Sequence, residues 1–175
     1  MFNKVTTIIK VNNEKLEIFM KKEEVLEHLR AAKLAHIKWV QKAKLLINGV
    51  DVEENAIPVD STECAFGKWF YTDGQVLNAL SNNPLECMNK IETLHFNLHD
   101  KYLDIFNIYF SKDKKAGFFA KLLGMKRKPV SDAEQQLAQD YYETMEKISK
   151  ELLDEISRLE RRLVAVSSEK IESLY

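Results

Sequence analysis

Apolar residues recur at spacings of three and four along three stretches of the chain, which is the pattern of amphipathic helices. The first stretch covers residues 21–48 and ends at Gly49, a residue suited to the position just after a helix. Its inward-facing positions are Val25, Leu29, Ala32, His36, Trp39 (or Val40), Ala43 and Leu46. We therefore predict a helix whose buried face carries His36.

The second stretch begins at Pro84, which suits the first turn of a helix, and runs to about residue 110. His95 and His99 lie on it four residues apart, so both side chains project from one face of the helix, a turn apart. The other members of the buried stripe are Met88, Ile91, Leu98, Tyr102, Ile105 and Tyr109.

The third stretch, residues 131–175, contains neither Gly nor Pro and opens on a capping-box pattern formed by Ser131 and Glu134. Apolar residues follow at near-heptad spacing: Tyr141, Met145, Ile148, Leu152, Ile156 (or Glu155), Leu159, Leu163 and Val166. This pattern predicts one long amphipathic helix that packs on a bundle or pairs as a coiled coil.

The intervening segments are less regular. Residues 1–20 fit a small hairpin or an irregular helical lead-in equally well. An acidic connection, residues 49–61, contains Pro58 and leads into a short helix capped by Ser61 or Thr62. Cys64 lies in the first turn of that helix, where free backbone N–H groups favour a thiolate, and Gly67 leaves room for another backbone.

Residues 112–130 form a basic connector between the second and third helices. Its part from 112 to 128 has seven basic residues against one acidic residue, together with Phe118, Phe119, Leu122 and Leu123. Such a segment can attach to an anionic membrane surface or to a partner. A helix end whose apolar residues dock on the bundle is the simpler interpretation, and we favour it.

The composition supports a helical protein, because only 5 Gly and 3 Pro occur in 175 residues. A net charge of −1 gives no electrostatic footprint for nucleic acid. Two cysteines are too few for a disulfide framework and fit a reducing, cytoplasmic environment. We find no apolar run long enough to span a membrane and no signal peptide. The predicted fold is an all-α, antiparallel four-helix-bundle-like domain with a long C-terminal helix.

One set of side chains on these elements suits a metal ion. His36, Cys64, His95 and His99 supply a thiolate and three imidazoles, the donors that tetrahedral zinc prefers. His28 lies about 80° away from His36 around its helix and is left out of the set. Each member alone has an ordinary interpretation as a core residue, and a zinc-protease motif is absent because Phe96 follows His95. The joint arrangement is what points to zinc.

The motifs His36-x-x-Trp39, Cys64-x-Phe-Gly67-Lys-Trp69 and His95-x-x-x-His99 follow one another on consecutive helical elements. In this order they resemble the chemoreceptor zinc-binding (CZB) domain family over roughly residues 25–110. The resemblance implies a four-helix fold, a homodimer, and zinc held by His36, Cys64, His95 and His99. It also implies a place on cytoplasmic chemoreceptors or diguanylate cyclases, whose output changes on zinc binding or on oxidation of the zinc-bound cysteine.

The expected organisation is a lead-in (1–20), a CZB-like zinc-binding domain (21–111), the connector (112–130) and the C-terminal helix (131–175). A site closed by four protein ligands leaves no position for substrate, so we expect a sensor rather than an enzyme. The chain has neither a diguanylate cyclase signature nor a long receptor signalling hairpin, so we expect it to act on a signalling partner. The alternative is a structural module in which zinc is a permanent staple.

Overall fold

The structure, a computed structural model, describes residues 3–80, 84–110 and 130–174, with side chains from residue 22 onward and without those of residues 84 and 85. The elements in chain order are α1 (Asn3–Ile47), α2 (Ala65–Phe70), the 3-10 helix η1 (Asp73–Ala79), α3 (Pro84–Phe110), α5 (Asp132–Val164) and α6 (Ser168–Glu172). These ranges contain no strand. The predicted all-α class is confirmed.

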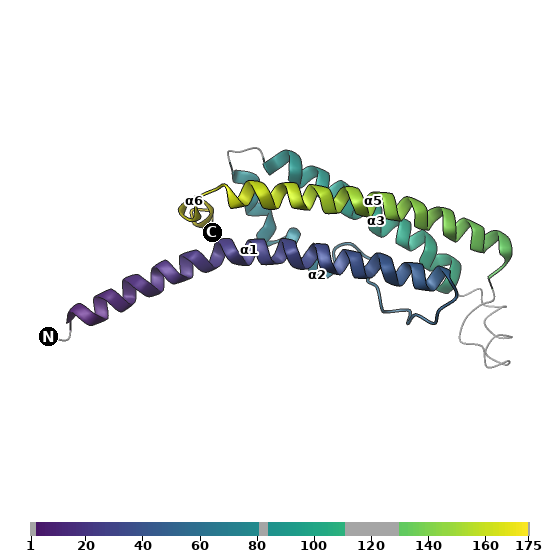
Figure 1. Ribbon diagram of the computed structural model, residues 1–175, viewed down its shortest axis with the longest axis horizontal. Coiled ribbons are helices and arrows are strands. Elements are labelled where there is room, and N and C mark those ends of the chain that lie inside the picture. The colour runs from purple at the N-terminus through teal and green to yellow at the C-terminus, as the bar shows by residue number, and fades with distance from the viewer. Residues whose placement is uncertain (1–2, 81–83, 111–129, 175) are drawn as a thin grey trace.

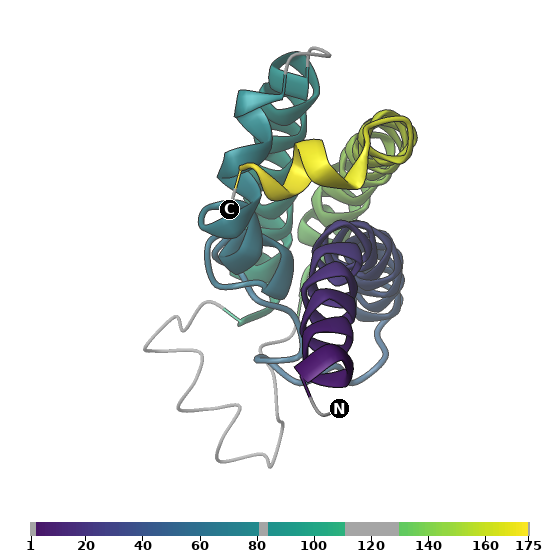
Figure 2. The same cartoon turned by 90° about the vertical axis from the view of Figure 1, so that its left-hand side faces the viewer.

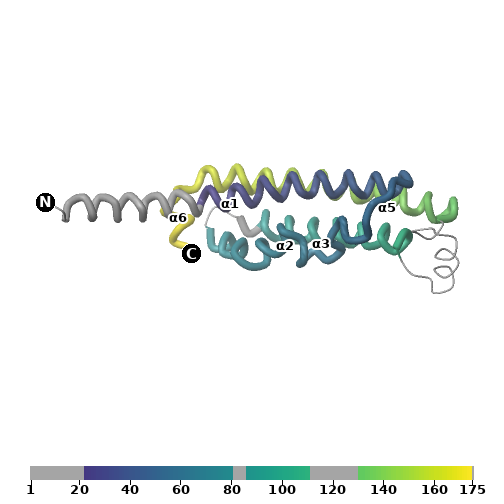
Figure 3. The backbone as a smooth tube through the Cα atoms, turned by 90° about the horizontal axis from the view of Figure 1, so that it is seen from below, coloured from purple at the N-terminus to yellow at the C-terminus, as the bar shows by residue number. Residues whose placement is uncertain are grey.

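Three long helices build the bundle (Figure 1). α1 and α3 run in the same direction, and α5 runs antiparallel to both. Seen end-on, the three helices lie at the corners of a triangle (Figure 2). The chain from residue 48 to residue 80 returns along the bundle with α2 packed on α1 and η1 packed on α3 (Figure 3). This largely irregular segment therefore runs antiparallel to α1 and takes the place of the second helix of a four-helix bundle.

α1 is longer than the periodic stretch that predicted it. The helix begins at Asn3, so the hairpin that we considered for residues 1–20 is wrong and the helical alternative holds. Nothing in the sequence before Gly49 interrupts a helix, because this part of the chain contains neither Gly nor Pro. Gly49 ends the helix as predicted and adopts the left-handed conformation with φ 79°.

The C-terminal region packs on the bundle and does not stand away from it. α5 buries Ala138, Tyr142, Met145, Ser149, Leu152, Ile156, Leu159 and Leu163, an unbroken heptad series against α1 and α3. Tyr141 and Ile148, which the sequence placed on the buried stripe, are only half-buried at its margin. The capping box of Ser131 and Glu134 is present as predicted.

The prediction of one uninterrupted helix over residues 131–175 is wrong. α5 ends at Val164, and Ser167 caps the separate helix α6. The Lys22 ammonium on α1 donates to the carbonyl oxygens of Val164 (3.1 Å) and Val166, which no longer have helical partners. The hydroxyl of Ser167 accepts from the backbone N–H of Lys170, and this local bond competes with continuation of α5.

A buried charge connects α3 to α5. Glu155 is only 5% exposed, and its carboxylate pairs with Arg158 (3.1 Å) on α5 and with Lys90 (3.5 Å) on α3. Beside it, the Arg162 guanidinium donates to the sulfur of Cys87 at 3.1 Å. Burial, helped by Glu155, raises the pKa of the Cys87 thiol, which agrees with its interpretation as a buried thiol without a metal role.

Residues 112–128, for which we considered contact with a membrane surface and favoured docking on the bundle, lie outside the described residues. No helix that the structure describes is long and apolar enough to cross a bilayer.

We predict that Ser131→Ala lowers the free energy of unfolding by about 1 kcal/mol. The substitution removes the hydroxyl that accepts the backbone N–H of Glu134 and leaves that donor at the start of α5 without its partner. Urea denaturation followed by circular dichroism measures the change. Ser131→Asp keeps an acceptor at the cap and should retain most of the stability, whereas equal losses in both variants would contradict the capping argument.

Candidate metal centre

Three elements bring the four predicted ligands to one place. His36 projects inward from α1, His95 and His99 from α3, and Cys64 from the N-terminal end of α2. One donor atom from each of the four residues lies within 4.8 Å of the others. The three histidines are buried and Cys64 is half-buried, so the cysteine forms the side of the cluster nearest to solvent.

Two of the imidazoles are oriented by backbone carbonyl groups. The Nδ1 atom of His36 lies 2.7 Å from the carbonyl oxygen of Ala32, and Nδ1 of His99 lies 2.9 Å from that of Val59. A carbonyl oxygen can only accept, so each Nδ1 carries the proton and donates it. Each Nε2 therefore keeps its lone pair for the cluster, and Nε2 of His99 is buried without a hydrogen-bond partner among the described residues.

His95 lies closest to the thiol and is held differently. Its Nε2 atom is 3.2 Å from the sulfur of Cys64, while its buried Nδ1 atom has no hydrogen-bond partner within residues 3–80, 84–110 and 130–174. Packing fixes the ring instead: it meets the ring of Phe66 edge-on, with 5.0 Å between the centroids. Leaving the buried Nε2 of His99 without a partner among the described residues is costly unless the cluster holds a cation.

Cys64 is itself the N-cap of α2, in place of the predicted Ser61 or Thr62. Its sulfur accepts the backbone N–H of Gly67 at 3.2 Å. The sequence suggested that this position favours the thiolate, but burial raises the pKa of the Cys64 thiol by more than the N–H groups of Gly67 and Phe66 lower it. The helix end alone does not ionise Cys64, so a cation is needed to hold it as thiolate.

Gly67 makes the tight turn at Cys64 possible. A Cβ atom at this position would lie 1.8 Å from the carbonyl oxygen of Ser61, closer than any side chain can approach. The expectation that Gly67 leaves room for another backbone is confirmed, and the backbone it admits is the segment just before Cys64.

Aromatic rings close the cluster off from water. Trp39, predicted as a core residue, packs on His99 with 4.2 Å between centroids, and Phe66 lies edge-on to His36. His28, which we left out of the ligand set, stacks on Trp69 with 5.1 Å between the ring centroids and 13° between the ring planes. That stack holds α2, and therefore Cys64, against α1.

Burial keeps the histidines neutral. Burial first, and the neighbouring histidines second, lower the pKa of His36 to about 4 and that of His95 to about 2. Burial also lowers the pKa of His99. Neutral imidazoles are the form that binds metal ions.

The donor set fits tetrahedral zinc. Bond lengths of about 2.0 Å to nitrogen and 2.3 Å to sulfur place the ligand atoms of such a site about 3.3–3.6 Å apart. The cluster, with all of its donor atoms within 4.8 Å, is slightly wider, and modest rotation of the side chains closes it. The two histidines with carbonyl partners also have the outer hydrogen bonds that metal-bound imidazoles usually make.

The spacing of the side chains brought all four candidates into view, but it did not reveal the carbonyl groups of Ala32 and Val59. Ala32 is the residue four positions before His36 on the same helix, a relation that the sequence contains. Val59 lies in the irregular connection 40 residues before His99, and no local pattern identifies it.

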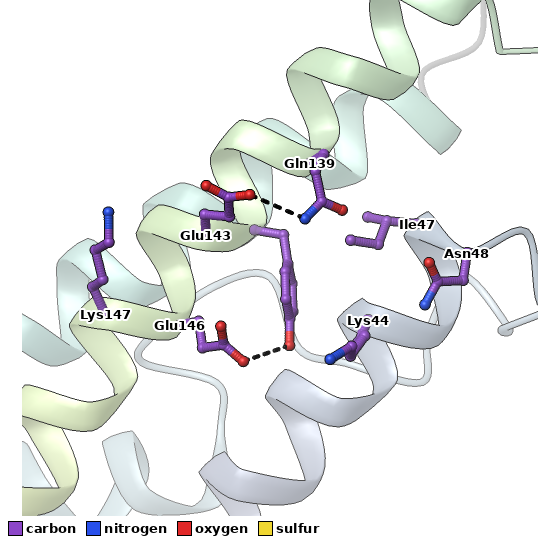
Figure 4. A pocket seen from close by; sticks show the side chains of 8 residues that line it. Lys44, Ile47, Asn48, Gln139, Glu143, Glu146 and Lys147 are labelled. Atoms are coloured by element: carbon purple, nitrogen blue, oxygen red, sulfur yellow. Dashed lines mark hydrogen bonds between the residues drawn. The ribbon is translucent and has the colours of Figure 1, made fainter.

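A separate hollow of about 360 Å³ lies away from the cluster, between the C-terminal end of α1 and α5 (Figure 4). Its polar walls are partly paired with each other, through Gln139 with Glu143 (3.3 Å) and Tyr142 with Glu146 (3.2 Å). None of the four clustered side chains lines this hollow.

We predict that Gly67→Ala destabilises the chelator-treated protein by roughly 2 kcal/mol or more, because the backbone at Ser61 must move to admit the methyl group. Gly49→Ala is the matched control: its Cβ meets open space, so it should cost only the left-handed conformation, about 1 kcal/mol. Urea denaturation compares the two variants. A smaller cost at position 67 than at position 49 would show that the turn at Cys64 yields easily.

We also predict that the metal-free protein loses stability as the pH falls from about 6.5, the pKa of an unfolded histidine, towards about 4, the pKa of buried His36. In this pH range the imidazoles bind protons in the unfolded chain but not when they are buried in the folded protein. Lowering the pH therefore lowers the free energy of unfolding, by roughly 1 kcal/mol per imidazole and pH unit. Urea denaturation with a chelator at pH 7 and pH 5 measures the loss. His36→Gln should show a shallower pH dependence, and identical slopes would mean that His36 is not buried in its neutral form.

Comparison with known proteins supports this arrangement. Residues 36–105 match the family model of the chemoreceptor zinc-binding domain, a span that begins at His36 and includes Cys64, His95 and His99. No curated protein and no solved structure matches the chain. The resemblance deduced from the three motifs is confirmed, and zinc is the cofactor of this domain. Over residues 36–105 the chain is therefore similar to the chemoreceptor zinc-binding domain family.

Proposed function

We propose that the chain is a zinc-dependent sensor and that His36, Cys64, His95 and His99 are its zinc ligands. The observation that carries the proposal is the convergence of four metal-binding donors from three elements, where no other described residue offers the buried Nε2 of His99 a hydrogen bond. Bound zinc supplies a divalent charge that stabilises the Cys64 thiolate. Four protein donors leave no place for a substrate, and we propose no catalytic activity.

The positions of the four residues couple the site to helix packing. His36 lies on α1, Cys64 at the start of α2, and His95 and His99 on α3. The site holds α1, α2 and α3 together only while all four side chains bind the metal ion. Among the described elements α3 packs most extensively on α5, so a change at the site reaches α5 through α3. We propose α5 as the helix through which the signal leaves the domain.

Cys64 is the residue through which an oxidant acts. It is the half-buried member of the cluster, and the other three are buried. A peroxide transfers one oxygen atom to the thiolate sulfur and releases hydroxide, which converts Cys64 to its sulfenic acid. The product is a weaker metal donor, so the contact between α2 and α3 loosens. Zinc occupancy and oxidation thus act on the same three elements.

The rest of the proposal follows from the family. We propose a cytoplasmic protein that forms a homodimer and signals to a chemoreceptor or a diguanylate cyclase. The competing function is a structural one, in which zinc is a permanent staple. The aromatic rings around the cluster favour slow zinc exchange, which is what the structural function requires, so the experiment below tests both functions.

We predict that the purified protein holds one zinc ion per chain and that Cys64→Ala, His36→Ala, His95→Ala and His99→Ala each weaken binding at least tenfold, because each variant removes one of four donors. Native mass spectrometry measures metal identity and stoichiometry, and competition with a chromophoric chelator measures affinity. Cys87→Ala is the matched control, since Cys87 lies outside the cluster.

Wild-type protein without zinc, or Cys64→Ala with unchanged zinc affinity, would contradict the ligand assignment. Zinc exchange and treatment with peroxide separate the two functions. Zinc exchange within minutes supports sensing. So does an increase or decrease in amide hydrogen exchange of α2 and α3 after oxidation, provided that Cys64→Ala abolishes it. Zinc that neither exchanges nor responds to peroxide supports the structural function.

A further inference from the structure

A wide hollow of about 740 Å³ lies at the end of the bundle where α1 and α3 both end (Figure 1). Its apolar walls are formed by the half-buried side chains of Val59 and Phe106 and by the exposed ring of Pro58. The ring of Phe106 packs against that of Phe110, the last residue of α3, with 4.9 Å between the centroids. The apolar surface therefore extends from the hollow to the point where the chain leaves α3.

The rim of this hollow is acidic. It carries the exposed carboxylates of Glu53 and Glu54, and the connection from residue 49 to residue 61 contains no basic residue. No described residue forms an ion pair with either glutamate. Lys42 of α1 reaches this connection, but its ammonium group donates to the backbone carbonyl of Ala56 at 3.1 Å. The rim therefore offers two carboxylates to a positively charged ligand.

The chain itself contains a segment of complementary character. Residues 112–128 have seven basic residues against one acidic residue. The large apolar residues of this segment are Phe118, Phe119, Leu122 and Leu123. The segment starts two positions after Phe110, at the negative end of α3, whose last turn contains no basic residue.

The segment is long enough to reach the hollow. Phe106 lies one helical turn, about 6 Å, before the end of α3. The eight residues from Phe110 to Phe118 span at most roughly 29 Å when fully extended. The distance to the hollow is therefore well within the reach of the chain.

We propose that this hollow is the docking site of the chain's own residues 112–128. The apolar side chains of the segment cover Phe106 and Pro58, and its lysines face Glu53 and Glu54. Because the segment belongs to the same chain, its effective concentration at the hollow is in the millimolar range, so weak contacts are sufficient. A docked segment turns its positive charges towards the protein and not towards an anionic membrane.

The docking site meets the metal centre at one residue. Val59 lines the hollow, and its carbonyl oxygen accepts the Nδ1 proton of His99 at 2.9 Å. A segment that covers Val59 excludes water from this hydrogen bond and so helps to hold the imidazole in its orientation. This link rests on the proposed zinc function, whereas docking itself does not require zinc.

A labelled synthetic peptide of residues 112–128, added to the full chain, tests the site by fluorescence anisotropy. The variant Phe118→Ser/Phe119→Ser/Leu122→Ser/Leu123→Ser removes the apolar contacts of the chain's own segment and frees the hollow. The peptide should therefore bind this serine variant at least tenfold more tightly than the wild type, in which the chain's own segment competes with it.

Charge reversal then locates the bound peptide. Adding Glu53→Lys/Glu54→Lys to the serine variant should weaken peptide binding about tenfold or more, because attraction at the rim becomes repulsion. Adding Glu151→Lys/Asp154→Lys instead is the matched control, at two exposed acidic residues of α5, and should leave binding unchanged. Circular dichroism checks that each variant keeps its helical content.

Three results would overturn the proposal: equal binding of the peptide to the wild type and the serine variant, no binding to either, or equal effects of the two charge reversals. Co-sedimentation of the wild type with phosphatidylserine vesicles, abolished in the serine variant, would overturn it too, since the segment would then bind the membrane. Zinc content is measured on the same samples. One zinc ion per chain without docking would refute only this inference, and docking without zinc would refute only the zinc sensor.

Discussion

The structure depends on the need to satisfy polar groups that are buried in an apolar core. Three imidazoles and one thiol meet where α1, α2 and α3 pack together, and the nitrogens Nδ1 of His95 and Nε2 of His99 have no partner in the part of the chain that the structure describes. Burial makes their protonated forms unfavourable, so protons cannot serve as the missing cation. A metal ion accepts one lone pair from each of the four side chains, including the unpartnered Nε2 of His99, and its binding energy then contributes to holding the helices together.

The local structure around Cys64 serves this requirement. Gly67 lets the chain turn back on Ser61, which places the sulfur at the N-terminal end of α2, and the stack of His28 on Trp69 holds that short helix on α1. Neither feature supplies a ligand. Together they place a donor from an irregular segment beside two donors from a regular helix, which a six-residue helix could not do by itself.

Periodicity was sufficient to place His36, His95 and His99, because the inward face of a helix follows directly from its spacing. It was insufficient where tertiary contacts decide the outcome. The end of α5 at Val164 depends on Lys22, more than 140 residues earlier, and the orientation of His99 depends on the carbonyl of Val59. Sequence analysis also overestimated the effect of the helix end on Cys64, because the desolvation of its sulfur depends on neighbours that the local sequence does not reveal.

The buried carboxylate of Glu155 restricts how α5 can move. Its partners Lys90 and Arg158 lie on α3 and α5, so sliding α5 along α3 by a fraction of a turn would separate it from Lys90 inside a region of low dielectric constant. Translation of α5 along α3 is therefore opposed. Because Glu160 of α5 also pairs with Arg30 (2.9 Å) and Lys33 on α1, charged side chains tie α5 to both of the long helices beside it.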